Sequence, residues 1–574
     1  MNNIQEAIGM AIVGLLLFSS LAFAGSNVKG AVINTSNTTN KANVALGSES
    51  KANLDSVNLK DSSVTGAVVN TPAGTTSLNV AVGTNNKANL SSVNMESSSV
   101  KGAVVNTSAG QTNTNVAVGS GNTANLGATN LHGSDVKGAI INTAAGQTVT
   151  NVALGKDNKA NLGATNLKGS DVKGVVVNTT AGQAVTNVAI GSGNKASLGA
   201  VNMQGSSAKG AIVNTVAGQA VTNVAIGSGN KASLGAVDMQ GSSAKGAIVN
   251  TAAGGAVTNV AIGSNNKANL SAVDMKSSSV KGAIINTAAG GAVTNVAIGS
   301  NNKANLAGVS MEKSSMKGNA VNTAAGGAVT NVAIGKGNKA NLAGVSMERS
   351  SMKGNVVNTA AGGAVTNVAI GSNSKANLSS VNLENSSMKG NVINTAAGGA
   401  VTNVAMGSNS KANLSSVNLE NSSVKGNIVN TVAGGAVTNI AAGSNARANL
   451  GSVDMKNSTG GSISNRVVGG AVTNIAAGSN TSANLGSVVL ENSSGGNISN
   501  RVYGGAVTNI AVGSGSEANS GSVVVKNSGV GGASTNSGAG LVINDVRVPF
   551  GEMSGANTNL AIGGQSNKNS VVFK

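Results

Sequence analysis

The sequence predicts an all-β protein, a parallel β-solenoid (β-helix) built from about fourteen repeats of 36 residues. First, the tripeptide Asn-Val/Ile-Ala recurs twelve times at a constant spacing of 36 residues, from Asn43 to Asn439, and twice more at spacing 35, at Asn474 and Asn509. Second, no apolar pattern follows a helical period, and Val, Thr, Asn and Gly disfavour helices. Since loops tolerate insertions, so constant a spacing indicates that each repeat stacks on the next.

One repeat, residues 209–244, shows how a coil is built. It contains three β-rich pieces, which are Gly210–Thr215, Val221–Ile226 and Ala232–Met239. Clusters of turn residues separate them at 216–219 and 227–230. We expect each repeat to form either one three-sided coil or two coils of about 18 residues, with layers about 4.8 Å apart.

The repeats align with one another, so their columns separate the inside of the coil from the outside. The column that runs from Leu59 through Met239 to Met455 is always a long apolar residue and should be core. The next column, from Lys60 through His132 to Lys456, keeps only polarity and should face water. We therefore expect His132, the single histidine, to be an exposed polar residue and not a catalytic or metal-binding one.

An asparagine column, always followed by Thr, predicts a ladder of stacked amides. In parallel coils, identical amides one layer apart can hydrogen-bond along the axis. The candidate ladder residues are Asn178, Asn214, Asn250, Asn286 and Asn322. The alternative is that these side chains cap turns locally. For Asn43 and its equivalents the two interpretations remain equally open.

Two lysine columns predict a regular row of positive charge. The candidate polyanion-binding residues are Lys195, Lys209, Lys231, Lys245, Lys267, Lys281, Lys303 and Lys317. Ammonium groups at a regular pitch suit an anionic polysaccharide or lipopolysaccharide. The alternative is that these lysines provide solubility and block wrong lateral pairing. No aromatic residues interleave with the lysines to stack bases, so we expect no sequence-specific nucleic-acid binding.

The amino-acid composition excludes several classes of protein function. The 574 residues include 81 glycines, 5 aromatics, 1 histidine and no cysteine, and the formal net charge is +18. Without cysteine there is no disulfide, no thiol chemistry and no Cys-ligated metal. We expect no catalytic site, no metal and no cofactor, and therefore no enzyme. Disorder is the other interpretation of so much Gly, Ser and Asn, but the chain is rich in Val and Ile and holds only 2 prolines.

The two ends of the chain differ from the repeats. Residues 1–24 hold an apolar run that ends in Ala22-Phe23-Ala24, which predicts a cleaved signal peptide and export to the cell surface or beyond. The alternative is a transmembrane anchor, for which the run is near the lower length limit. Residues 25–526 form the predicted solenoid domain. Residues 527–574, with a degenerate copy of the repeat at Asn559, should be a cap or an export segment.

Short motifs resemble two families of bacterial surface proteins. The string Asn187-Val188-Ala189-Ile190-Gly191 resembles the head repeats of trimeric autotransporter adhesins. The larger unit, residues 259–269, resembles the repeats of Fap-type and curli-type biofilm functional amyloids. Either resemblance covers about residues 26–525. The amyloid resemblance implies a β-rich secreted subunit that self-associates and crosses the outer membrane through an export apparatus.

We therefore expect an exported structural subunit of a fibre or matrix, at a bacterial cell surface or in a biofilm, which self-associates through stacked β-coils. The alternative is a surface adhesin that binds anionic glycans through its lysine columns. A third interpretation is ice binding by regular Thr arrays, although Thr lies beside Asn here and not in a flat Thr-x-Thr field.

Overall fold

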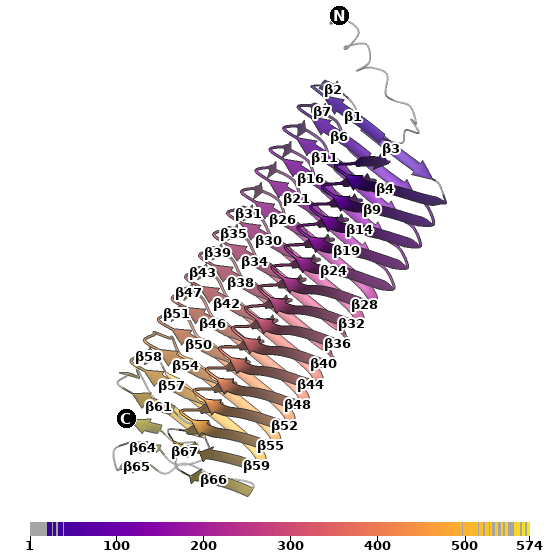
Figure 1. Cartoon of the computed structure of the whole chain (residues 1–574). Helices are drawn as coiled ribbons and strands as arrows, with labels where there is room; N and C mark the ends of the chain where they lie inside the picture. Colours follow the sequence, from indigo (N-terminus) through magenta and orange to yellow (C-terminus); the bar gives the residue numbers. More distant parts are fainter. Residues whose placement is uncertain are drawn as a thin grey trace, which may run out of the picture. The chain divides into compact units, whose positions relative to one another are not determined.

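The described part of the chain consists of β-strands and the turns between them (Figure 1). The computed structural model describes residues 20–25, 27–29, 32–37, 39–54, 56–495, 497–514, 516–520, 523–526, 529–530, 534–537, 541–543, 546–548, 556–562, 565–568 and 571–573. The chain divides into two compact units, Met1–Thr287 and Ala288–Lys574. Among the described residues, no helix is long and apolar enough to cross a membrane. Each unit is a parallel β-solenoid, as the sequence predicts.

One repeat of the first unit forms one coil with four strands. These are β28 (Ile212–Ser228), β29 (Lys231–Leu234), β30 (Val237–Gln240) and β31 (Ser243–Lys245). Each strand pairs in parallel with the strand 36 residues later, so that Asn214 of β28 lies beside Asn250 of β32 (Ile248–Ser264). We name the four resulting sheets, in this order, the arch sheet, the lysine sheet, the methionine sheet and the short sheet.

This geometry corrects two expectations about the coil. The constant offset of 36 residues means one coil per repeat, so the alternative of two coils is wrong. The coil also has four strands where the sequence predicts three pieces. The predicted piece 232–239 is split, because Gly235 takes a left-handed φ of 55° and turns the chain between β29 and β30.

The second unit repeats the same coil. An example is the coil made of β44 (Val356–Ser372), β45 (Lys375–Leu378), β46 (Val381–Glu384) and β47 (Ser387–Lys389). Its strands pair with those of the following repeat at the same offset, as Asn358 does with Asn394. The four sheets are therefore described in the same terms in both units.

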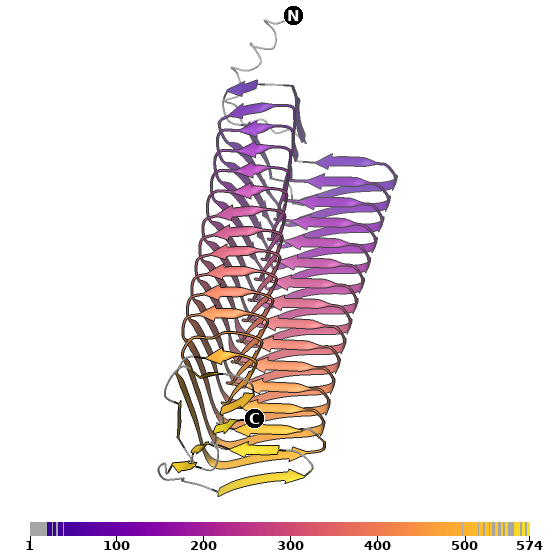
Figure 2. The same cartoon turned by 90° about the vertical axis from the view of Figure 1, so that its left-hand side faces the viewer.

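In each coil the chain of the arch sheet folds back on itself in two limbs (Figure 2). The limbs form one strand in β28 and two strands, β13 (Val104–Ala109) and β14 (Thr112–Ser120), in an earlier coil. The first limb of β28 buries Ile212 and Asn214, and its second limb buries Asn223 and Ala225. In an earlier coil the hydroxyl of Ser108 donates to Oδ1 of Asn113 over 3.1 Å, so the inner faces of the two limbs meet. The predicted turn cluster at 216–219 is the bend between the limbs.

Large apolar side chains lie on both faces of the arch. Val213, Val224 and Ile226 are half-buried on its outer face, whereas Ala225 is fully buried. The inner face also holds Ile212, which is fully buried. Side-chain size alone therefore does not indicate which face of these strands is inside.

The corner between the arch and the lysine sheet requires glycine. Gly227 has a φ of 116°, and a Cβ added to it would lie 2.1 Å from the carbonyl oxygen of Gly191 in the preceding coil. Nδ2 of Asn230 donates to the carbonyl oxygens of Ile226 (2.6 Å) and Gly191 (2.7 Å). This side chain ties the corner of one coil to the corner of the coil before it.

The methionine sheet separates core from surface as its columns predict. Leu59, Met203 and Met239 are each 2% exposed. The next residue along each strand faces outward, and His132 is exposed at this position. Long apolar side chains thus fill the coil beneath a polar outer row.

The predicted terminal segments are described only in part. Residues 1–19 of the predicted signal peptide lie outside the described residues, and Ser20–Ala24 form β1, which pairs with β6 (Ser56–Lys60). Near the other end, β66 (Ala556–Ile562) pairs with the second limb of β59 (Ile498–Val512), which places Asn559 beside Asn509. The degenerate copy of the repeat thus continues the solenoid, and its role as cap or export segment stays a prediction.

Candidate functional site: a lysine-rimmed trough

Stacked asparagines run along the inside of the arch. Nδ2 of four of the five candidates donates to Oδ1 of the asparagine in the next coil. The distances are 3.2 Å for Asn178–Asn214, 3.0 Å for Asn214–Asn250, 3.0 Å for Asn250–Asn286 and 2.9 Å for Asn322–Asn358. All five candidates are fully buried. Because a buried amide without partners is costly, the ladder satisfies groups that water cannot reach.

The second asparagine column combines the two interpretations that the sequence leaves open. Nδ2 of Asn223 lies 2.8 Å from Oδ1 of Asn259, which continues a ladder. The same nitrogen lies 3.0 Å from the carbonyl oxygen of Ala232 and 3.1 Å from that of Asn269, both in the lysine sheet. Asn223 therefore holds the second limb of the arch against the lysine sheet.

Two further ladders lie on the outside, and their direction is reversed. Nδ2 of Asn161 donates over 2.8 Å to Oδ1 of Asn125 in the preceding coil, and Asn166 does the same to Asn130. Inner amides thus donate toward the C-terminus and outer amides toward the N-terminus. The two outer ladders belong to the lysine sheet and the methionine sheet respectively.

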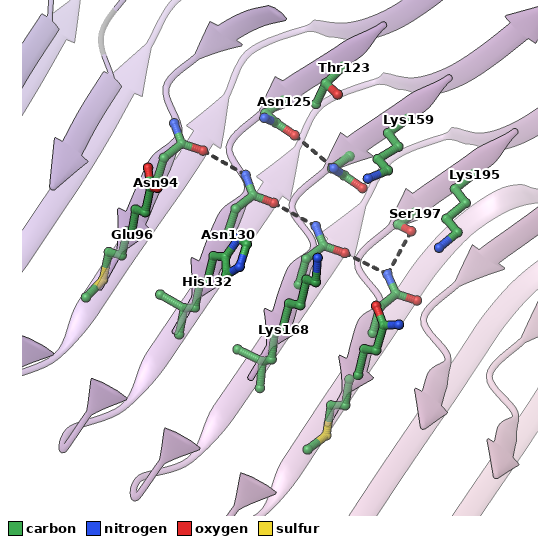
Figure 3. A pocket seen from close by; sticks show the side chains of 18 of the residues that line it. Asn94, Glu96, Thr123, Asn125, Asn130, His132, Lys159, Lys168, Lys195 and Ser197 are labelled. Atoms are coloured by element: carbon green, nitrogen blue, oxygen red, sulfur yellow. Dashed lines mark hydrogen bonds between the residues drawn. The ribbon is translucent and has the colours of Figure 1, made fainter. Parts of the chain in front are cut away.

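In the first unit, the outer faces of these two sheets form a trough of about 890 Å³ (Figure 3). On the lysine sheet it is lined by strands that include β5 (Lys51–Leu54), β10 (Lys87–Leu90), β15 (Thr123–Leu126), β20 (Lys159–Leu162), β25 (Lys195–Leu198) and β33 (Lys267–Leu270). On the methionine sheet these include β11 (Val93–Glu96), β16 (Thr129–His132), β21 (Thr165–Lys168), β26 (Val201–Gln204) and β34 (Val273–Lys276). We call this groove the basic trough.

The outer asparagine ladders form the floor of the basic trough, and long side chains form its rims. Nδ2 of Asn202 donates to Oγ of Ser197 over 2.8 Å, which joins the floor from one sheet to the other. Lys159 and Lys195 rise from the lysine sheet, while His132 and Lys168 rise from the methionine sheet (Figure 3). The trough thus combines amide groups below with ammonium groups above.

Positive charge dominates the part of the trough between residues 51 and 204. Six lysines line it against one carboxylate, that of Glu96. Among the described residues, no carboxylate lies within 4 Å of Lys159, Lys168 or Lys195. Burial lowers the pKa of Lys195, and the neighbouring charges of Lys231 and Lys159 lower it further. Both effects disfavour the ammonium form, and a bound anion would oppose them because an opposite charge favours the ammonium form.

The other end of the trough carries its own carboxylates. Lys231 lies 3.2 Å from Asp238, and Lys267 lies 3.3 Å from Asp274. Asp238 is only 3% exposed and also accepts a hydrogen bond from Ser233. Each of these lysines is therefore neutralised by an acid from the facing methionine sheet.

In the second unit, every lysine-sheet cation from Lys303 to Arg447 faces an acid across the same groove. The pairs are Lys303–Glu312 (3.9 Å), Lys339–Glu348 (3.4 Å), Lys375–Glu384 (3.0 Å), Lys411–Glu420 (3.2 Å) and Arg447–Asp454 (3.1 Å). Asp454 raises the pKa of Arg447. Burial lowers the pKa of Lys411, and Glu420 partly opposes that shift. The second unit therefore satisfies its lysine column with its own carboxylates.

The eight lysine candidates do not form one site. Lys195, Lys231 and Lys267 line the basic trough, and Lys303 is paired with Glu312 in the second unit. The other four belong to the short sheet or directly follow one of its strands, and all four are exposed outside the trough. They are Lys209, Lys245, Lys281 and Lys317.

The columns of the sequence alone do not reveal the residue that faces each lysine. A lysine in the lysine sheet and the acid opposite it are seven or nine positions apart, as in Lys231–Asp238 and Lys375–Glu384. The sequence does hold a signal, since Glu recurs nine residues after Lys from Lys303 onward but not at Lys159 or Lys195. Among the described residues, no group of three His, Cys, Asp or Glu side chains could hold a metal ion.

Comparison of the chain with protein-family models, curated proteins and solved structures finds no match.

Proposed function

We propose that this protein is an exported structural subunit of a fibre or matrix, at a bacterial cell surface or in a biofilm, which acts by self-association. The observation that carries the proposal is the outer face of the arch. Three of its outward columns, those of Val213, Val224 and Ile226, are apolar in most coils although they are in contact with water. Side chains at least 37% exposed in these columns are Ile33, Val44, Leu46, Ile190, Ile285, Ile393, Met406 and Val512.

Charge is nearly absent from the same face. In the arch strands between Val68 and Ser264, Lys156 is the single charged residue, and it lies at the end of its strand. Isolated exposed apolar residues are normal, but a contiguous uncharged apolar face marks an interaction surface. Packing two such faces together removes both from water, as in sheet-on-sheet interfaces.

A second support comes from the ladder itself. Oδ1 of Asn34, the first residue of the inner ladder, is buried and has no hydrogen-bond partner. An amide from the last coil of a second copy is a donor of the required kind. Stacking of copies would therefore extend the ladders, as it does in cross-β assemblies.

The experiment is fibre formation by the purified chain without residues 1–24, observed by electron microscopy and fibre diffraction. We expect fibres with an axial reflection near 4.8 Å. The double variant Ile226→Lys/Ile262→Lys adds two charges to the outer face of the arch and should abolish lateral packing. The matched control Gln204→Lys/Gln240→Lys adds the same charges on the methionine sheet and should leave the fibres unchanged. A chain that stays monomeric at high concentration contradicts the proposal.

A further inference from the structure

The part of the basic trough between residues 123 and 204 has no carboxylate of its own among its lining residues. Lys159 and Lys195 keep their positions on the lysine sheet, where Thr123 stands in the coil before them. On the facing sheet, His132, Lys168 and Gln204 stand where the second unit has glutamates. Lys159, Lys168 and Lys195 therefore face one another across a floor of amides (Figure 3). Unpaired like charges this close destabilise the coil unless a counter-anion is bound.

The second unit indicates which anion fits. At the equivalent positions, the acid opposite each lysine is a carboxylate on a flexible side chain. Its oxygen lies 3.4 Å from Lys339, 3.0 Å from Lys375 and 3.2 Å from Lys411. The backbone of the two units follows the same pattern, so a carboxylate supplied by a ligand would pair with Lys159 and Lys195 as glutamate pairs with lysine in the second unit.

The lining also indicates the rest of the ligand. The trough runs across successive coils, which lie about 4.8 Å apart, so it suits an extended chain with an acidic group at regular intervals. Asn166 uses one donor and one acceptor in its ladder, and Asn161 uses one donor, so amide groups of both residues remain for the hydroxyl groups of a ligand. His132 is the one ring among the residues that line the trough, which leaves no series of platforms for bases.

We infer that the basic trough, between residues 123 and 204, binds a linear polysaccharide that carries carboxylate groups, with Lys159, Lys168 and Lys195 as its counter-ions. This inference does not rest on fibre formation, because the trough is complete within one chain. Copies that pack through their arches would leave the trough open, since it lies on other sheets. A matrix subunit with such a trough would bind the acidic polysaccharide around it.

The test measures binding of fluorescently labelled polygalacturonate to the full chain. Binding is detected by fluorescence anisotropy of the label, at low and at high salt. We expect binding that weakens with salt, and little binding of the methyl-esterified polymer, which has the same backbone without free carboxylates. The triple variant Lys159→Gln/Lys168→Gln/Lys195→Gln should lose about ten-fold or more in affinity. The control is Lys173→Gln/Lys209→Gln/Lys245→Gln, which makes the same charge change on the short sheet. It should change the affinity by less than about two-fold.

A second variant separates binding from folding. Lys168→Glu/Gln204→Glu gives the trough the pattern of the second unit, so Lys159 and Lys195 acquire internal partners. It should bind as weakly as the triple variant while unfolding at the same temperature as the wild type or higher. The inference is overturned if the esterified polymer binds equally well. It is also overturned if the short-sheet control loses as much affinity, or if oligo(dT) binds more tightly through the same three lysines.

Discussion

The ammonium of Lys375 lies 3.0 Å from a carboxylate oxygen of Glu384, on the facing sheet of the second unit. Lys375 lowers the pKa of Glu384 below its ordinary value of 4.5. A carboxyl whose pKa is lower in the folded state stabilises the fold above its unfolded pKa, and that contribution is lost as the pH falls through the folded value. The pair is partly exposed, so its net contribution is small.

We expect Glu384→Gln to lower the free energy of unfolding at pH 7 by less than about 1 kcal/mol, as for other partly exposed ion pairs. The difference from wild type should shrink as the pH falls below 4.5, the ordinary pKa of the carboxyl. The difference in stability is measured from the urea unfolding midpoints of both proteins at several pH values between neutral and acidic. A difference that stays constant with pH would show that the pair contributes nothing through its charge.

Replacing Asn223 with leucine should be strongly destabilising. The change keeps the side-chain volume similar but removes the donor to Ala232 and the partner of Asn259. Each buried group left without a partner costs about 1–3 kcal/mol. The control is Thr222→Val, because Thr222 is half-buried on the opposite face of the same strand. Denaturant midpoints compare the two variants, and equal midpoints would mean that the inner ladder is not a source of stability.

Substitution of two glycines with left-handed backbone should affect stability to very different degrees. Gly227→Ala places a Cβ 2.1 Å from the carbonyl oxygen of Gly191, so the corner must open. Gly241 has a φ of 56° and nothing within 4 Å, and asparagine already holds the equivalent position at Asn385 and Asn421. Thermal unfolding should show a clear loss for Gly227→Ala and a change within about 0.5 kcal/mol for Gly241→Asn. Similar losses for both variants would contradict the close approach at Gly227.

Arg466 and Arg501 should limit lateral packing near the end of the repeats. Both are exposed on the first limb of the arch, where Thr431 stands in the preceding coil, and they lie directly beside each other. Charged residues on an exposed sheet face oppose packing against another sheet. We expect Arg466→Thr/Arg501→Thr to associate at a lower protein concentration, as measured by light scattering.

The control for the arginine variant is Lys389→Thr/Lys425→Thr, which removes the same charge from exposed positions of the short sheet. It should leave the association threshold close to that of the wild type. If both variants lower the threshold equally, net charge controls association and the arch has no special role.

The sequence predicts the solenoid well because each repeat serves as an alignment for the others. The buried column with Met239 and the outward column with His132 both follow from which property is kept from repeat to repeat. The turn at Gly235 is harder to predict, since one glycine inside a β-rich piece does not by itself mark a turn. The left-handed residue ends the strand after Leu234, and the inward positions change phase from Ala232 and Leu234 to Val237 and Met239.

The basic trough is not visible in the sequence for a different reason. It depends on the angle between the lysine sheet and the methionine sheet, and no periodicity encodes that angle. Asp238 illustrates the difficulty: it occupies an outward position but is only 3% exposed, because the facing sheet covers it. The outward placement of Val224 and Ile226 is equally hidden, since hydrophobicity alone would place them inside and Ala225 outside.

The opposed ladders give the solenoid a chemical polarity. Nδ2 of Asn178 donates to Asn214 in the following coil, whereas Nδ2 of Asn161 donates to Asn125 in the preceding coil. The inner row therefore begins with an acceptor without a partner, the oxygen of Asn34. A second copy that met this end with its own Asn34 would present one oxygen to another. In the proposed stacking of copies, this row therefore favours contact between opposite ends of two chains over contact between like ends.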